Sequence, residues 1–205
     1  MPRQKVDGSE LVQALHDGID TWNRALRGCG VPMLRLGKSV DDLHPLKQDG
    51  VSIVVVRVGA WCGDDDPRRQ RCHDPALQGI TTLYPAQNPG HSDDGALREA
   101  DVELNAVDFT WSLAGDRPGT RSLRALVAHE LGHVLGLDHL CNPKEAVVLK
   151  TAVNPSAPIC GATNRHGSIM FPAVESDLRQ QILEPGRSET ALLCHVYAER
   201  DSGQQ

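Results

Sequence analysis

The sequence has little that would suit a membrane or nucleic-acid-binding protein. No apolar run approaches the ~20 residues that a helix needs to cross a bilayer, and the first residues lack the apolar core of a signal peptide. The 205 residues carry a formal net charge of −6, so no basic surface indicates a nucleic-acid partner. Aromatic residues make up only 3% of the chain, yet 40% of its residues are hydrophobic, which predicts a loop-rich globular protein.

Six cysteines are present, and none of them forms a Cys-x-x-Cys pair of the kind found in zinc fingers and redox motifs. An even number at wide spacing favours disulfides in an oxidising compartment over six reduced thiols in the cytosol. We therefore expect a secreted or extracytoplasmic protein. Many pairings are open to six cysteines, but short loops favour Cys62–Cys72 and Cys141–Cys160, which leaves Cys29–Cys194.

Hydrophobic periodicity divides the chain into helices and strands, with no internal repeat and no linker. Helices are predicted at 9–27, with Ser9 as the N-cap, at 121–137, which is the strongest, and at 188–200. Strands are predicted at 33–36, 51–58, 80–84 and 101–111, the last with an irregularity. We predict one domain, residues 1–205, in which residues 1–8 are an unstructured or artificial start.

Residues 129–139 have the residue types and the spacing of a zinc site. His129 and His133 are four residues apart, so both imidazoles leave the same face of a helix. Gly136 tolerates a left-handed conformation that can end the helix and bring His139 back as a third ligand. Three protein ligands leave one tetrahedral position open, as in catalytic zinc, whereas structural zinc fills all four.

Glu130 follows the first of these histidines and is the predicted general base. Zinc lowers the pKa of bound water toward ~7, and a nearby carboxylate can take up the proton and pass it to the leaving amine. These features predict a zinc-dependent endopeptidase that hydrolyses extended polypeptides. The alternatives are a catalytically inactive zinc-bearing protein that binds peptides, and a structural zinc domain with a fourth protein ligand.

The pattern His-Glu-x-x-His-x-x-Gly-x-x-His is the metzincin signature, and Ser168-Ile-Met-Phe-Pro172 resembles the Met-turn of that family. Within the metzincins, the chain resembles the matrixin branch in the segments HELGHVLGLDH, SIMFP and ITTLYP. We expect it to be a bacterial relative of that branch. The resemblance implies an α/β (α+β) catalytic domain with a twisted mixed sheet, an active-site helix, the Met-turn and a C-terminal helix. It also implies one catalytic Zn²⁺ above Met170, which is an apolar floor and not a ligand.

The resemblance further implies how a substrate binds. An extended peptide would pair with the strand at 80–84, and residues 171–174 would form the opposite wall of the pocket. We expect a monomer that acts on protein or peptide substrates.

The matrixin pattern is not followed at 59–79, where we find no structural zinc and calcium loop. Cys62 and Cys72 stand there instead, and we expect their disulfide to replace the ions. Calcium binding by the three aspartates at 64–66 is unsupported, because calcium sites need ligands at alternating, defined positions.

Residues 27–32, Arg-Gly-Cys-Gly-Val-Pro, resemble the cysteine switch that keeps matrixin zymogens latent. A switch should precede the catalytic domain, whereas this stretch follows the first predicted helix. We therefore expect Cys29 to form a disulfide or to serve a turn.

Overall fold

A computed structural model describes residues 5–39, 46, 48–62, 72–91, 93–142, 157–160, 168–172 and 183–202. Its helices are α1 (Gly8–Ala25), α2 (Leu123–Val134) and α4 (Arg187–Ser202). Its strands are β1 (Val54–Arg57), β2 (Gly79–Pro85), β3 (Leu97–Asn105), β4 (Trp111–Ser112) and β5 (Arg121–Ser122). This is the predicted α+β fold, and no helix in the described residues is long and apolar enough to span a membrane.

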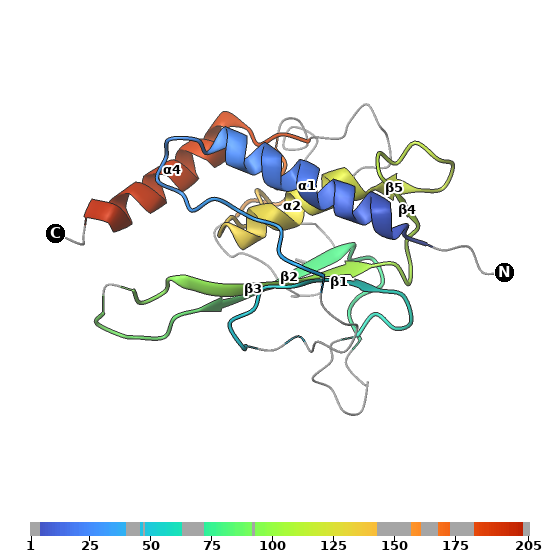
Figure 1. Ribbon diagram of the computed structural model, residues 1–205, viewed down its shortest axis with the longest axis horizontal. Helices are drawn as coiled ribbons and strands as arrows, with labels where there is room; N and C mark the ends of the chain where they lie inside the picture. The colour runs from blue at the N-terminus through green and yellow to red at the C-terminus, as the bar shows by residue number, and fades with distance from the viewer. Residues whose placement is uncertain are drawn as a thin grey trace.

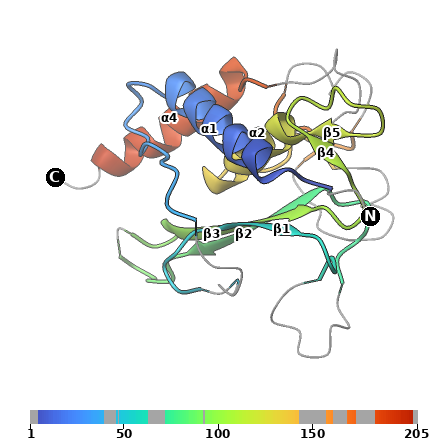
Figure 2. The same cartoon turned by 45° about the vertical axis from the view of Figure 1, so that its right-hand side comes forward.

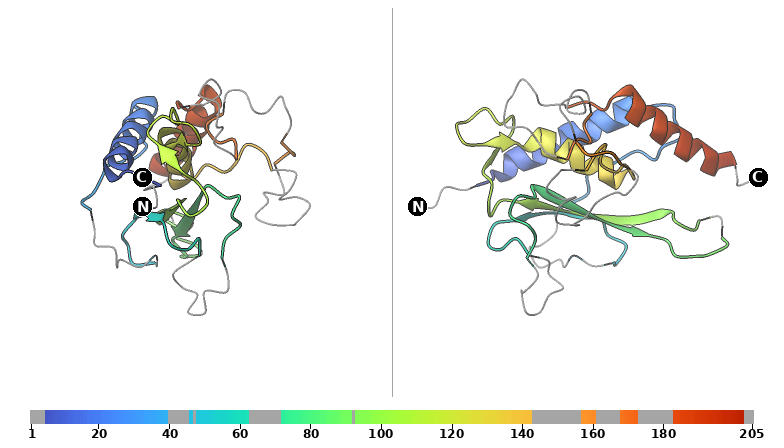
Figure 3. Two further views of the ribbon diagram at one scale, coloured as in Figure 1. Left: turned by 90° about the vertical axis from the view of Figure 1, so that its right-hand side faces the viewer. Right: turned by 180° about the vertical axis from the view of Figure 1, so that it is seen from behind.

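The main sheet is mixed, with the strand order β1-β3-β2. β1 runs parallel to β3, whereas β2 runs antiparallel to it, with Thr81 opposite Val102. α1 and α2 lie side by side on one side of this sheet, as Figures 1, 2 and 3 show from four directions. β2 is therefore an edge strand of the described sheet and lies beneath α2.

The core fills the space between the sheet and the two helices. Trp22 of α1 is wholly buried, and its indole Nε1–H donates to the carbonyl oxygen of Ala128 in α2 at 2.8 Å. Gly18 allows the helices to approach closely, because a Cβ there would lie 3.0 Å from Leu131 Cδ1. These contacts hold α2 in one place against α1.

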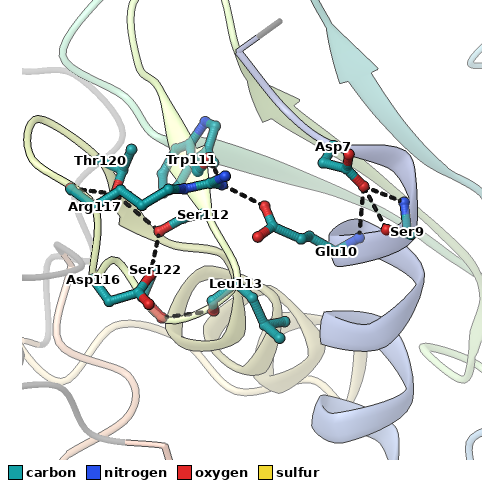
Figure 4. Close-up of polar contacts among 10 residues, drawn as sticks. All are labelled: Asp7, Ser9, Glu10, Trp111, Ser112, Leu113, Asp116, Arg117, Thr120 and Ser122. Atoms are coloured by element: carbon teal, nitrogen blue, oxygen red, sulfur yellow. Dashed lines mark hydrogen bonds and ion pairs between the residues drawn. The ribbon is translucent and has the colours of Figure 1, made fainter.

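The helix α1 begins one residue earlier than predicted, and its N-cap is Asp7, not Ser9. The Asp7 carboxylate accepts the backbone N–H groups of Ser9 at 2.8 Å and Glu10 at 3.2 Å, which satisfies donors left free at the helix start (Figure 4). Arg117, from the loop after β4, donates to the Glu10 carboxylate at 2.5 Å. Distant parts of the chain are thus joined at this end of α1.

In the predicted unstructured start, residues 5–8 are ordered, and residues 1–4 lie outside the described residues. Val6 is buried in the core, and the carbonyl oxygen of Lys5 accepts the backbone N–H of Trp111 at 2.9 Å. Backbone pairing with a distant segment fixes this stretch. The stretch is too short to show a periodicity from which the pairing could be predicted.

The strand predicted at 33–36 is absent, because a side chain takes the place of a neighbouring strand. The Asn23 amide oxygen accepts the backbone N–H of Leu34, and the amide nitrogen donates to the Leu34 carbonyl, both at 2.9 Å. The segment stays extended against α1 without joining a sheet.

The strand predicted at 101–111 is two elements, and Asn105 separates them. The Asn105 side-chain oxygen accepts the backbone N–H groups of Val107 and Asp108, both at 3.0 Å, which turns the chain at the end of β3. The chain then re-enters extended structure at Trp111 in β4.

The helix predicted at 121–137 is shorter at both ends. Its first two residues form β5, which pairs parallel with β4, and the Ser122 hydroxyl then accepts the backbone N–H of Ala125 as the N-cap. Figure 4 shows Ser122 at this boundary. The helix α2 ends at Val134, two residues before Gly136.

All six cysteines lie in the described residues and form the predicted disulfides, Cys29–Cys194, Cys62–Cys72 and Cys141–Cys160. Cys29 is therefore no free thiol, and its bridge ties the turn after α1 to α4. The aspartates at 64–66 lie outside the described residues.

Candidate zinc site

Three histidines converge at the end of α2. The Nε2 atom of His139 lies 3.2 Å from the Nε2 atom of His129 and 3.2 Å from that of His133. One donor atom from each ring lies within 4.8 Å of the others, and in the described part of the chain no other His, Cys, Asp or Glu group has this spacing. The three residues predicted from the motif are thus brought together.

Gly136 makes the turn that brings His139 back. Its φ is 96°, in the left-handed region that glycine adopts without a steric penalty. The backbone N–H of Gly136 donates to the His133 carbonyl at 2.8 Å, and that of Leu137 donates to the Gly132 carbonyl at 3.0 Å. These bonds close the end of the helix, so the chain reverses toward the ligand face.

Backbone carbonyls orient two of the rings. The Nδ1 atom of His129 lies 2.8 Å from the carbonyl oxygen of Ile169, and that of His133 lies 2.7 Å from the carbonyl oxygen of Leu137. A carbonyl only accepts, so each Nδ1 carries the proton and each Nε2 presents its lone pair to the centre of the cluster.

Burial also keeps these rings in the neutral form that binds metal. It lowers the pKa of His129 and of His133. The pKa of His139 falls to about 3, mainly through burial and then through its electrostatic interactions with His129 and His133. Three neutral imidazoles with converging lone pairs are a donor set that fits Zn²⁺ with one position left open.

The Met-turn lies against the backbone of α2. Met170 is buried, and a Cβ on Gly132 would lie only 2.3 Å from its sulfur. The Met170 carbonyl accepts the backbone N–H of Leu140, the residue after His139, at 3.1 Å. The Met-turn therefore supports both the helix and the returning ligand.

Glu189 of α4 holds this turn in place, and sequence reasoning missed it. One carboxylate oxygen accepts the Ser168 hydroxyl at 2.6 Å and the backbone N–H of Met170 at 3.4 Å, and the other accepts the backbone N–H of Gly186. The sequence does not indicate this role, because an acidic residue in the first turn of a helix is ordinarily exposed. Glu189 is buried instead.

Glu130 is also buried, and its carboxylate faces β2. The Thr81 hydroxyl donates to Glu130 Oε2 at 2.6 Å. Burial raises the pKa of Glu130, while the electrostatic interaction with His133 and the hydrogen bond from Thr81 oppose that rise. Thr81 was not singled out from the sequence, because only the fold places this strand beneath the helix.

Asp138, directly before the third histidine, and the predicted pocket wall are also described, the wall in part. The Asp138 carboxylate accepts the backbone N–H of His139 at 2.7 Å, as a residue that caps the turn does. In the predicted pocket wall at 171–174, Phe171 and Pro172 are half-buried, and the other two residues lie outside the described ones.

One known protein family matches the part of the chain that forms this site. The family model of the matrixins matches residues 78–157, from the start of β2 to beyond the three histidines. The predicted matrixin resemblance is confirmed. No curated protein sequence matches the chain. The matrixin match and the three-histidine group together suggest a zinc metalloprotease, and the match with three disulfides suggests an extracellular protein.

Proposed function

We propose that this protein is a zinc-dependent endopeptidase that hydrolyses peptide bonds in extended polypeptides. The observation that carries the proposal is the convergence of three histidine donors on a helix whose buried Glu130 interacts electrostatically with one of them, His133. His129, His133 and His139 would hold the zinc, and Gly136 and Met170 support that geometry.

A bound Zn²⁺ would supply a Lewis acid that polarises the scissile carbonyl and acidifies water. Glu130 accepts a proton from the attacking water and returns it to the amine of the leaving product. Its burial favours this role, because a raised pKa brings a carboxylate closer to the pH at which it must both take and release a proton.

The edge strand β2 is the proposed docking site for the substrate backbone. Its inner side pairs with β3, and an extended peptide could add to its outer side as a further strand. Phe171 and Pro172 would form part of the opposite wall. The proposed substrates are therefore unfolded or extended segments of proteins.

The first experiment compares cleavage of an unfolded protein by the wild type and by Glu130→Ala, each with its zinc content measured. We expect one zinc per chain in both, cleavage by the wild type alone, and loss of that cleavage when a chelator removes the metal. Glu184→Gln, which changes an exposed carboxylate, is the matched control and should remain fully active.

Two outcomes would overturn the proposal. If zinc-loaded wild type and Glu130→Ala were equally inert but bound extended peptides, the protein would be the inactive peptide binder. A zinc-bound crystal structure with a fourth protein ligand would instead make the site structural.

We also propose that residues 1–205 form one catalytic domain, secreted or extracytoplasmic, that acts as a monomer. Sedimentation at several protein concentrations tests the monomer, and a dimer at micromolar concentration would exclude it.

A further inference from the structure

The strand beneath α2 contacts the Glu130 carboxylate at both of its oxygens. Oε2 accepts the hydroxyl of Thr81, and a Cβ built on Gly79 would lie 2.3 Å from Oε1. Thr81 and Gly79 are two residues apart in β2, so they lie on the same face of the strand.

The position of this hydroxyl is fixed by the sheet. Thr81 lies opposite Val102 in the antiparallel pairing of β2 with β3, and α2 contacts both strands. Neither oxygen of Glu130 has a hydrogen bond from α2 itself among the described contacts. The described hydrogen bond that orients the carboxylate therefore comes from β2 and not from α2.

We propose that Thr81 is a positioning residue that holds the Glu130 carboxylate by Oε2 and leaves Oε1, over Gly79, to exchange the proton. The inference rests on the proposed function of Glu130 as the general base. The hydroxyl can donate to Oε2 whether or not Oε1 carries a proton, so one geometry serves both halves of the reaction.

Gly79 has a separate part in the same arrangement. A methyl group there would overlap Oε1 and lie 2.8 Å from Cδ of Glu130, so it would displace the carboxylate without changing Thr81 itself. The Glu130 side chain, being buried, has little room to move aside except by leaving its hydrogen bond.

The experiment measures kcat and KM for Thr81→Val, Thr81→Ser and Gly79→Ala in the zinc-loaded full chain. Valine keeps the β-branched shape and removes only the hydroxyl, so kcat should fall by about 10–100-fold with KM changed less than about twofold. Serine should restore kcat to within about threefold of wild type, and Gly79→Ala should lower kcat by about tenfold.

Matched controls are Thr21→Val, a half-buried threonine whose hydroxyl accepts from the exposed Arg24, and Gly37→Ala, where a Cβ has no described atom within 4 Å. Both should keep wild-type kcat. Zinc content should be the same in Thr81→Val as in wild type, and its crystal structure should show the Glu130 carboxylate turned away from its native position.

Wild-type kcat in Thr81→Val, failure of serine to rescue, or an unmoved Glu130 carboxylate would each overturn the inference. If Thr81→Val folds poorly, Gly79→Ala decides, and full kcat in that variant overturns it. An inert wild type defeats the proposed function itself. A wild type that cleaves and depends on Glu130, but not on Thr81, defeats only this inference.

Discussion

The sharpest structural prediction concerns Glu189, which links the C-terminal helix to the Met-turn. Its two carboxylate oxygens accept from Ser168, Met170 and Gly186. In Glu189→Gln, one oxygen becomes an amide that donates and cannot accept. The side-chain oxygen can then accept from Ser168 or from Gly186 but not from both, while the Met170 N–H keeps the Ser168 hydroxyl as an acceptor at 3.0 Å.

The expected cost follows from these contacts. Glu189 is 8% exposed, so an unsatisfied donor beside it is shielded from water. One unsatisfied buried N–H costs about 1–3 kcal/mol, and the remaining bonds lose their charge assistance. We expect the free energy of unfolding to fall by about 2–3 kcal/mol, which corresponds to roughly 5–10 °C in melting temperature for a chain of this size.

The effect should extend to zinc, because the Met-turn orients a ligand. The carbonyl of Ile169, next to Met170, accepts from His129 Nδ1 at 2.8 Å. Loosening of that carbonyl should weaken zinc binding by about tenfold, the lower end of the range for such supporting residues.

The assays are urea unfolding followed by Trp fluorescence and zinc affinity by competition with a chromogenic chelator. Glu184→Gln makes the same chemical change at a carboxylate whose side chain is 74% exposed, and it should change stability by less than about 0.5 kcal/mol. If Glu189→Gln matched this control in both stability and zinc affinity, the supporting role of Glu189 would be wrong.

Three further changes test the fold and the charge state of the site. Trp22→Phe removes the indole N–H that bonds the Ala128 carbonyl and should lower the unfolding free energy by about 2 kcal/mol in urea titrations; an unchanged midpoint contradicts the link between the helices. Replacing Cys29 and Cys194 by serine should cost about 2–5 kcal/mol, because their bridge spans 165 residues, and equal melting temperatures would refute this. The low pKa of His139, about 3 against an ordinary 6.5, means that the unfolded chain takes up this proton first. Metal-free protein should therefore lose stability as the pH falls below 6.5, by up to about 1.4 kcal/mol per pH unit from this residue. His139→Asn should lack this contribution to the pH dependence. Equal slopes of unfolding free energy against pH in the two proteins would exclude the contribution.

The spacing of apolar residues was enough to predict the edge strand and the two helices that pack on the sheet. The apolar periodicity predicted α1 correctly because one continuous face of the helix is buried, with Leu15, Ile19 and Trp22 in the core. The predictions failed where side chains replaced backbone partners. Asn23 satisfies Leu34 without a strand, and a sequence does not show which distant amide will do so.

The histidine cluster was predictable because its geometry is local. His133 follows His129 by four positions, one helical turn, and one left-handed glycine brings back His139. Short loops likewise favoured two of the disulfide pairings, and elimination left the third.

The sequence by itself thus determined the residue types of the site, because a helical turn and a glycine place the ligands within eleven residues of chain. Only the tertiary structure decided what surrounds them. Thr81 comes from an edge strand and bonds Glu130 across 49 residues, whereas Glu189 comes from the last helix and bonds Ser168 of the Met-turn across 21 residues. Packing of separate elements creates such contacts, and no local period along the chain encodes them.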